Sequence, residues 1–227
     1  MLEDRSKLDN PVFHSLNEVH QDKVIQYGGV KFYSPLYCAF GGVTDPYMMT
    51  EGLSAYARLS SDFFIVGEAP IFDASLTLVK ELVCLQMVLD NPIDLSLTEE
   101  IIPLESKAQK QALFELVNLV QPGYFKKKTT DLGHYYGIYQ DKQLVAVCGE
   151  RMKMNHFTEI SAIVTHPRYT GRGYAKQLIK QCVQNIFQEG KTPYLHVVRS
   201  NTPAINLYKK LGFLTRREIS FWQLASR

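Results

Sequence analysis

The chain has 227 residues, of which 45% are hydrophobic and 21% are charged, and its formal net charge is +2. These values are typical of a soluble globular protein with room for a core, arranged as one large domain or two small ones. The polar N-terminus argues against a secretory signal, and the lack of a run of about 18 apolar residues argues against a membrane span. The four cysteines are widely spaced, which argues against a disulfide framework and a zinc site. We therefore expect a cytoplasmic protein without a metal.

The two halves of the chain differ in charge. Residues 1–98 contain 6 Lys and Arg against 13 Asp and Glu, whereas residues 99–227 contain 19 against 10. A basic half suits an anionic partner. Its positive charges are mixed with acids and form no basic stripe, which favours a phosphorylated cofactor over a nucleic acid. The turn-like segment 91–94 supports a division of the chain into 1–98 and 99–227.

In the first half, aromatic and β-branched residues predict a strand or hairpin arm over 30–40. A short helix is predicted from residue 50 to about residue 59, and 63–66 is interpreted as a buried strand. The stretch 76–89 fits either a helix or a strand, and we favour a short helix followed by a strand over 82–89.

The second half has clearer periodicity. Ser106 and Gln109 form a capping box before a helix whose apolar residues continue to Val120. The stretch 175–187 has one apolar face over three turns, which predicts a long helix. The other predicted elements are strands at 101–102, 134–140, 144–152, 157–165 and 194–198, a short helix between Pro203 and Gly212, and one or two strands over 215–224. The order β-α-β-β-β-α-β-α-β predicts a mixed α/β layer fold.

The loop Thr170–Ala175 leads from a predicted strand into the long helix. Gly171 and Gly173 let backbone N–H groups approach a ligand closely, and the helix N-terminus adds a partial positive charge. We therefore interpret the loop as a pyrophosphate site, which Arg172 and Lys176 could reinforce. The loop lacks the Gly-Lys-Ser/Thr of a Walker motif, and Lys176 stands where the dinucleotide fingerprint needs a third glycine or alanine.

Two segments resemble the GNAT superfamily of N-acyltransferases. The loop fits the acyl-CoA pattern R/Q-x-x-G-x-G/A of that superfamily, except that Thr170 replaces the usual Arg or Gln, and Asn201–Phe213 resembles its later helical segment. The resemblance covers roughly 99–227, and Asp9–Val12 is similar to the opening of a bacterial subgroup with an extra N-terminal region. It implies a GNAT catalytic domain over 99–227, preceded by an accessory, degenerate GNAT-like domain over 1–98.

The resemblance also implies how acetyl-CoA binds. Backbone groups of 163–165 would pair with the pantetheine like an added strand, and the next strand would splay away to admit it. Asn201 would hydrogen-bond the pantetheine, or it would serve only as a helix N-cap. The cofactor-binding residues expected on this basis are Ile163, Val164, Thr165, Thr170, Gly171, Arg172, Gly173, Tyr174, Ala175, Asn201 and Ala204.

Direct acyl transfer needs one group that removes a proton from the amine and another that protonates the thiolate. The resemblance implies that Glu159 is the general base through water, and the alternative is an ion pair with Arg151. His196 is the second candidate base, because an imidazole pKa of about 6.5 suits the task, or it packs in the core. Tyr208 would protonate the thiolate, although its ring also fits a core position.

The sequence thus predicts an enzyme that transfers an acetyl group from acetyl-CoA to the primary amine of a small molecule or peptide, without a nucleic-acid or membrane partner. No cysteine nucleophile is expected, since Cys148 and Cys182 are interpreted as core residues. One alternative is a non-catalytic acyl-CoA sensor, which the Thr170 departure suggests. Another is a transferase of longer acyl groups, because the two-part layout resembles glycine N-acyltransferases. Lys126–Lys128 is interpreted as a solvated loop or as a flap that touches the acceptor or the cofactor.

Overall fold

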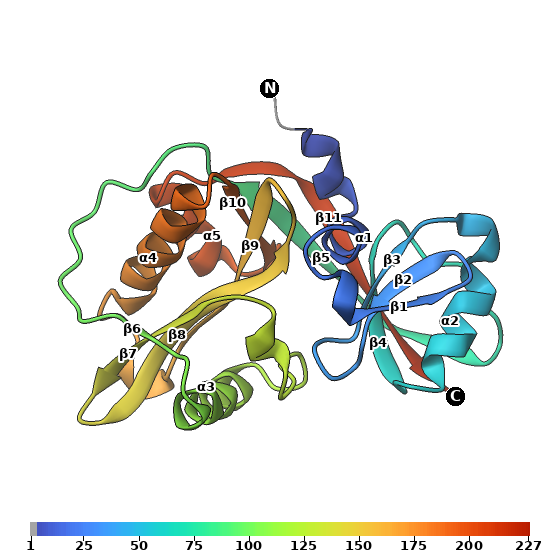
Figure 1. Ribbon diagram of the computed structural model, residues 1–227, viewed down its shortest axis with the longest axis horizontal. Helices are drawn as coiled ribbons and strands as arrows, with labels where there is room; N and C mark the ends of the chain where they lie inside the picture. Colours follow the sequence, from blue (N-terminus) through green and yellow to red (C-terminus); the bar gives the residue numbers. More distant parts are fainter. Residues whose placement is uncertain (1–3) are drawn as a thin grey trace.

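The computed structural model describes residues 4–227 and contains one mixed β-sheet, with strand order β1-β2-β3-β4-β11-β5-β10-β9-β8-β7-β6 (Figure 1). The strands are β1 (Val24–Tyr27), β2 (Val30–Tyr33), β3 (Phe40–Val43), β4 (Asp62–Gly67), β5 (Leu76–Val88), β6 (Ile102–Pro103), β7 (Tyr135–Gln140), β8 (Gln143–Lys153), β9 (Phe157–Thr165), β10 (Thr192–Val198) and β11 (Leu214–Ser226). The helices are α1 (Pro11–Asn17), α2 (Met49–Ala57), α3 (Lys107–Val120), α4 (Tyr174–Gln188) and α5 (Thr202–Lys210). Short 3-10 helices are η1 (Arg5–Asp9), η2 (Gln21–Lys23), η3 (Pro46–Met48), η4 (Thr129–Asp131) and η5 (Pro167–Tyr169).

The second half has the predicted order of elements, and the expected mixed α/β fold is confirmed. The capping box before α3 is present, because Ser106 accepts from the backbone of Gln109 and the Gln109 side chain accepts from the backbone of Ser106. Residues 214–226 form one strand. No helix in the described part of the chain is long and apolar enough to cross a membrane.

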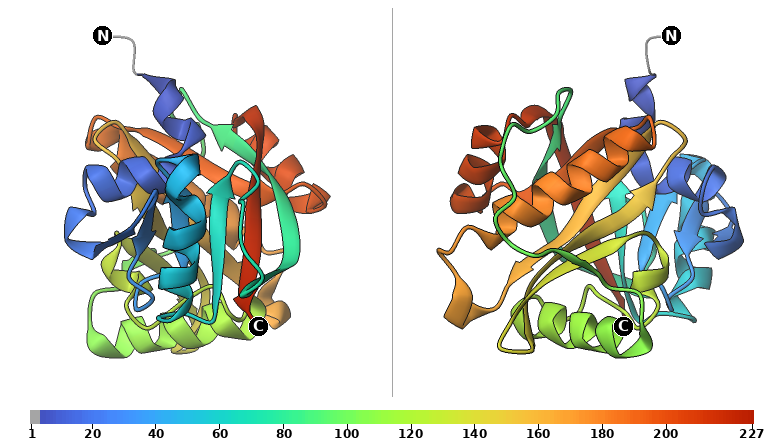
Figure 2. Two further views of the ribbon diagram at one scale, coloured as in Figure 1. Left: turned by 90° about the vertical axis from the view of Figure 1, so that its right-hand side faces the viewer. Right: turned by 60° about the vertical axis from the view of Figure 1, so that its left-hand side comes forward.

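Helices α3 and α4 cover opposite faces of the sheet around β8, and Figure 2 shows α4 crossing this part of the sheet. Ala146 and Cys148 of β8 pack in the core cluster that contains the buried face of α4. Val147, which lies between them, packs in the cluster that contains α3. Successive side chains of a strand point to opposite faces, so the sheet is enclosed between the two helices here.

The first half forms the other end of the sheet, where β1, β2 and β3 are antiparallel and β4 joins β3 in parallel. Helix α1 packs against β2 and β3. Asn10 caps α1 by accepting a hydrogen bond from the backbone N–H of Phe13 at 3.2 Å. Pro11 then takes the first helical position, where its missing N–H is not needed. Our sequence reasoning missed this helix, although Asn-Pro is a recognisable helix start.

The strand β5 is continuous from Leu76 to Val88, so the prediction of a short helix at its beginning was wrong. It pairs with β11 along its length, and these backbone hydrogen bonds keep the first residues extended. Leu78 and Val79 remain 44% and 51% exposed. Nothing in the local sequence reveals β11, which lies far along the chain, and this tertiary pairing overrides local preference.

Strands from the two halves of the chain alternate in the middle of the sheet. The strand β5, from the first half, lies between β10 and β11 from the second, while β11 lies between β4 and β5. The sheet is therefore continuous across the two predicted regions. The division at residue 98 stays a prediction about the organisation of the sequence, as does the relation of 1–98 to a GNAT domain.

Candidate functional site

The strands β9 and β10 diverge after a short parallel contact. They pair only where Phe157–Glu159 lies beside Thr192–Tyr194. Beyond this point β10 continues beside β5 and β9 continues beside β8. Ala162, at φ 50°, lies where the pairing of β9 with β8 is irregular, and such irregularities bend a strand. Within residues 4–227, no strand pairs with Ile163–Thr165 on the β10 side, which is the splayed arrangement expected.

A pocket of about 370 Å³ lies at this divergence. Its lining combines β9, β10 and α5 with side chains from β3, β4, β5 and β11, so both halves of the chain contribute to it. The structure brings six predicted site residues together here. They are Glu159, Ile163, His196, Asn201, Ala204 and Tyr208.

The predicted pyrophosphate loop lies outside that lining, before helix α4. Gly171 and Gly173 adopt φ of 79° and 82°, a left-handed conformation that favours glycine. Gly173 is the N-cap of α4, so the N–H groups of the first turn, which begins at Tyr174 and Ala175, lie at a helix N-terminus suited to an anion. The Thr170 hydroxyl donates to the Pro167 carbonyl at 3.2 Å.

Arg172 extends the positive character of this loop. Its guanidinium lies over the ring of Tyr169, with the carbon Cζ 4.9 Å from the ring centroid, a cation–π contact that holds it beside the loop. The loop therefore combines left-handed glycines, a helix N-terminus and a cation. That combination fits a pyrophosphate, and the roles of its residues stay predictions.

Asn201 and Tyr208 lie at the two ends of α5. The Asn201 side chain accepts a hydrogen bond from the backbone N–H of Ala204 at 3.2 Å, so it caps the helix. Asn201 also lines the pocket. Tyr208 is 7% exposed, packs against Phe213 and lines the pocket as well. Burial raises the pKa of the Tyr208 hydroxyl above its ordinary value, which keeps it protonated and able to donate.

Glu159 and Arg151 form a buried ion pair at the point where β9 and β10 separate. Arg151 donates from Nε and Nη2 to the two carboxylate oxygens of Glu159, each at 2.7 Å. Burial alone would raise the pKa of Glu159, but the charge and hydrogen bonds of Arg151, with a further hydrogen bond from His196, hold that pKa at about 2. The carboxylate is thus ionised and a weak base.

His196 has both ring nitrogens engaged. Its Nδ1 lies 2.8 Å from Glu159 Oε1, and its Nε2 lies 3.1 Å from Gln86 Nε2. Gln86 also donates to the Leu8 carbonyl and accepts from Arg216 Nη1, and these two contacts fix the orientation of its amide. It follows that Gln86 donates to His196 Nε2 and that His196 Nδ1–H donates to Glu159.

Several residues of this site were missed by sequence reasoning. Gln86 fixes the His196 tautomer, and Phe40, Phe64 and Phe221 face the pocket. Aromatic residues in strands usually belong to the core, so these three carried no separate functional signal. Arg151 was considered only as a partner of Glu159, although its side chain also lines the pocket.

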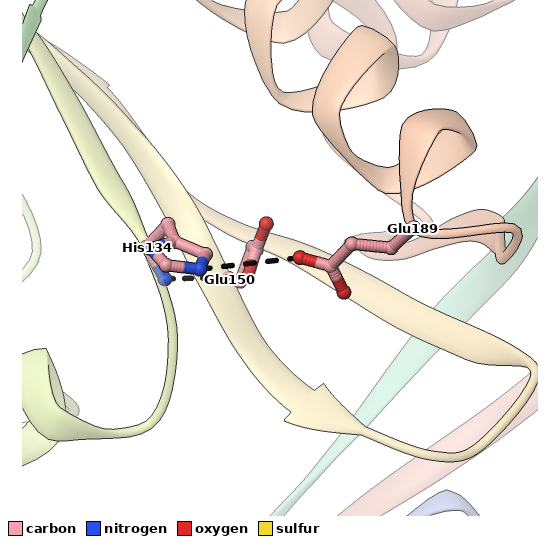
Figure 3. A group of neighbouring side chains, drawn as sticks. All are labelled: His134, Glu150 and Glu189. Carbon is pink, nitrogen blue, oxygen red and sulfur yellow. Dashed lines mark hydrogen bonds and ion pairs between the residues drawn. The ribbon is translucent and has the colours of Figure 1, made fainter.

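A second polar cluster lies away from the pocket and contains His134, Glu150 and Glu189 (Figure 3). The candidate ligand atoms of these three residues lie within 4.8 Å of one another. No other group of three or more His, Cys, Asp or Glu residues in the described part of the chain meets this distance. Lys153 Nζ already provides a cation there, 2.7 Å from Glu150 and 3.4 Å from Glu189. An internal ammonium leaves little reason for a metal, and the expectation of a metal-free protein stays a prediction.

The segment Lys126–Lys128 is tied to the residues that precede β3. The backbone N–H of Lys128 donates to the Leu36 carbonyl at 3.2 Å, and the hydroxyl of Thr129 donates to the Tyr37 carbonyl. The neighbouring Phe125 and Thr129 line the pocket. The segment is therefore held beside the pocket, and its predicted contact with a cofactor or acceptor remains a prediction.

Comparisons with known proteins show which family and which solved structures this chain resembles. The family model for FR47-like protein matches residues 135–222. The structure of a protein described as a GNAT-family acetyltransferase from Novosphingobium aromaticivorans is similar to this chain, with 28% sequence identity and a TM-score of 0.88. The alignment covers 97% of this chain and 98% of that one. No curated protein gives a significant match.

More distant structures share the fold. A GCN5-related N-acetyltransferase from Kribbella flavida has 13% identity and a TM-score of 0.65, over 100% of this chain and 96% of that one. A tandem GNAT protein from the clavulanic acid biosynthesis pathway has 12% identity and a TM-score of 0.58, over 87% and 78% of the two chains. At these identities the similarity concerns the fold alone.

Proposed function

The chain belongs to the GNAT superfamily, and on that premise we propose that it is an acetyl-CoA-dependent enzyme that transfers an acetyl group directly to the primary amine of a small molecule or peptide. The observation that carries the proposal is the divergence of β9 and β10 beside a pocket that Tyr208 lines. A thioester at this point would be open to an amine that enters from the other side of the sheet.

The proposed path of the cofactor follows from three features. Its pyrophosphate would bind at the N-terminus of α4, where Gly171 and Gly173 expose backbone N–H groups. The pantetheine amides would pair with the unpaired edge of Ile163–Thr165, as an added strand does. Asn201, whose carbonyl oxygen caps α5, still has its amide N–H₂ available for the pantetheine.

We propose that Tyr208 protonates the departing thiolate, since its hydroxyl stays protonated and lines the pocket. Neither Glu159 nor His196 is well suited to act as the general base. Glu159 has a pKa of about 2, and the lone pair on His196 Nε2 accepts from Gln86. The geometry therefore favours an amine that binds neutral, or that loses its proton to water in the pocket, with Glu159 and His196 shaping the site.

Two measurements test the proposed function. Calorimetry should detect acetyl-CoA binding at micromolar to millimolar ligand, and an amine panel should show CoA release together with an acetylated product by mass spectrometry. Tyr208→Phe keeps the ring but loses the hydroxyl, so kcat should fall by about 100-fold while acetyl-CoA affinity is retained. Binding without turnover over the whole panel would favour an acyl-CoA sensor, and no binding would overturn the proposal.

A further inference from the structure

One wall of the pocket is aromatic. Phe40, Phe64 and Phe221 come from β3, β4 and β11 and line the pocket together with Tyr124. The Phe40 ring centroid lies 5.7 Å from those of Phe64 and Phe221, in edge-to-face geometry. Tyr124 continues this surface, 5.5 Å from Phe64, and it is 36% exposed. These four residues, the aromatic wall, form one continuous surface that favours a ring over a polar chain.

The guanidinium of Arg151 lies against the aromatic wall, with Cζ 4.7 Å from the ring centroid of Phe40. An arginine has five N–H donors arranged as a fork. Arg151 uses one from Nε and one from Nη2 on Glu159. Within residues 4–227, Arg151 Nη1 has no hydrogen-bond partner and is not among the fully buried polar atoms that lack one. The Arg151 side chain is 15% exposed and lines the pocket.

This arrangement leaves the Nη1/Nη2 edge of Arg151 available in the pocket. That edge matches a carboxylate, which accepts two parallel N–H donors. The Nε/Nη2 edge, by contrast, already holds Glu159. Arg151 can therefore bind two carboxylates at once, one from the protein and one from a ligand.

The pocket offers little to a second ammonium group. Glu159 is the one carboxylate among the described residues that line it. Its oxygens already accept from Arg151 and His196, and the backbone N–H of Met152 lies 3.4 Å away. With these lone pairs engaged, a polyamine or a lysine side chain would find no counter-charge.

We propose that the acceptor is a small amine that carries both an aromatic ring and a carboxylate, as an aromatic α-amino acid does. Its carboxylate would bind the free edge of Arg151, and its ring would lie on the aromatic wall. The pocket volume of about 370 Å³ must also hold the acetyl end of the cofactor, which limits the acceptor to a size near one ring. This inference rests on the proposed function, because it assumes that an amine is acetylated in this pocket.

Four probe amines that differ in their functional groups test the inference on the wild-type protein. Phenylalanine has both groups, phenethylamine lacks the carboxylate, alanine lacks the ring, and cadaverine replaces both by a second ammonium. The value of kcat/KM should be highest for phenylalanine, at least about tenfold lower for phenethylamine and for alanine, and lowest for cadaverine. Equal or better turnover of phenethylamine, alanine or cadaverine would overturn the inference and leave the proposed function intact.

Two adjacent phenylalanines of β4 provide a matched pair of variants. Phe64 lines the pocket, whereas Phe63 is buried in a separate core cluster with Phe32 and Tyr56. Phe64→Leu should raise KM for phenylalanine severalfold more than KM for alanine, while Phe63→Leu should change both alike. A shift of the two KM values by the same factor in Phe64→Leu would contradict a ring on the aromatic wall.

Arg151→Lys keeps the charge beside Glu159 but loses the fork, so it should reduce the preference for phenylalanine over phenethylamine. If this variant fails to fold, the comparison of probe amines on the wild-type protein still tests whether the acceptor carries a ring and a carboxylate. Phenylalanine that neither binds in calorimetry nor is acetylated overturns the inference, and the separate measurement of acetyl-CoA binding then shows whether the proposed function fails with it.

Discussion

Glu159 Oε1 lies 2.8 Å from His196 Nδ1, so the two residues that the sequence offers as alternative bases belong to one buried cluster. Arg151 holds the other side of Glu159, and Gln86 holds the other side of His196. A substitution of any member therefore changes the protonation and orientation of its neighbours. Kinetic effects at one position cannot be assigned to that side chain alone.

The first prediction concerns the stability that this cluster provides. Glu159→Gln would leave the Arg151 charge buried without its counter-ion, which should lower the free energy of unfolding at pH 7 by about 3–5 kcal/mol. The exposed pair of Glu218 and Arg199 provides a control, and Glu218→Gln should cost less than about 1 kcal/mol. Urea unfolding measures both, and equal values would contradict a stabilising buried pair.

The pH dependence of Glu159 adds a second test of the same pair. Its pKa is about 2 in the folded protein, below the ordinary 4.5. A carboxyl whose folded pKa is depressed stabilises the protein above its ordinary pKa and loses that stabilisation as the pH falls toward the folded pKa. The free energy of unfolding should thus decrease from pH 4.5 toward 2, and this component should be missing in Glu159→Gln.

A second prediction concerns His20, which is 3% exposed. Its ring nitrogens lie 2.8 Å from the Tyr33 hydroxyl and 3.0 Å from the Leu132 carbonyl. Burial, reinforced by the charge of Lys23, lowers its pKa from 6.5 to about 4. The unfolded chain therefore binds a proton first as the pH falls from 6.5 to 4, and about 3 kcal/mol of stability should be lost in that window.

Urea titrations between pH 7 and 4 would measure this loss. His20→Gln keeps an amide donor and acceptor at the site and should remove most of the pH dependence in that window. His156 is exposed and serves as the control, because His156→Gln should leave the dependence unchanged. If the free energy of unfolding of His20→Gln still fell with pH as steeply as in the wild type, other groups would be responsible for the loss of stability.

The third prediction separates backbone strain from cofactor contact. Gly171 and Gly190 both have positive φ, 79° and 70°, and a Cβ at either would meet no atom within 4 Å. Alanine at either position should therefore lower the free energy of unfolding by a similar amount, about 1–2 kcal/mol. Gly171 lies in the proposed pyrophosphate loop, whereas Gly190 follows the other end of α4.

Only Gly171→Ala should also weaken acetyl-CoA binding, by about tenfold, because its methyl group would occupy space that the backbone needs to approach the pyrophosphate. Calorimetry on the two variants measures the difference. The same affinity in both would place the pyrophosphate elsewhere.

The fourth prediction concerns Thr170, where the superfamily pattern has Arg or Gln. Thr170→Arg adds a cation beside the proposed pyrophosphate and should tighten acetyl-CoA binding by about tenfold at low salt, since a charge-assisted hydrogen bond contributes about 1.5 kcal/mol. The gain should shrink as ionic strength rises. Thr170→Met, which has length without charge, should show no gain, and a gain in it would exclude an electrostatic cause.

Much of the second half was predictable because its signals are local. The helix α4 shows a clear period because Leu178, Ile179, Cys182, Val183 and Ile186 are fully buried on one face. The glycine loop before it needs only six neighbouring residues to be recognised. Such features depend on residues that are close together in the sequence, so they can be recognised from the sequence alone.

The rest depends on contacts between distant parts of the chain. Gln86 and His196 are 110 positions apart, yet the orientation of the Gln86 amide determines the tautomer of His196. The aromatic wall combines Phe40, Phe64 and Phe221 from three strands whose order follows only from the whole sheet. Without that order, a buried aromatic residue that faces a pocket cannot be told from one in the core.

The place of β11 between β4 and β5 also has a consequence for the growing polypeptide. Both neighbours of β5 are strands made more than a hundred residues after it, so β5 must wait unpaired while the ribosome adds the intervening chain. The aromatic wall is incomplete for the same period, because Phe221 arrives last. At a synthesis rate of about 5–20 residues per second, this interval lasts about 5 to 30 seconds. During this time the exposed edges of β5 and β4 are open to chaperones or to pairing with another nascent copy.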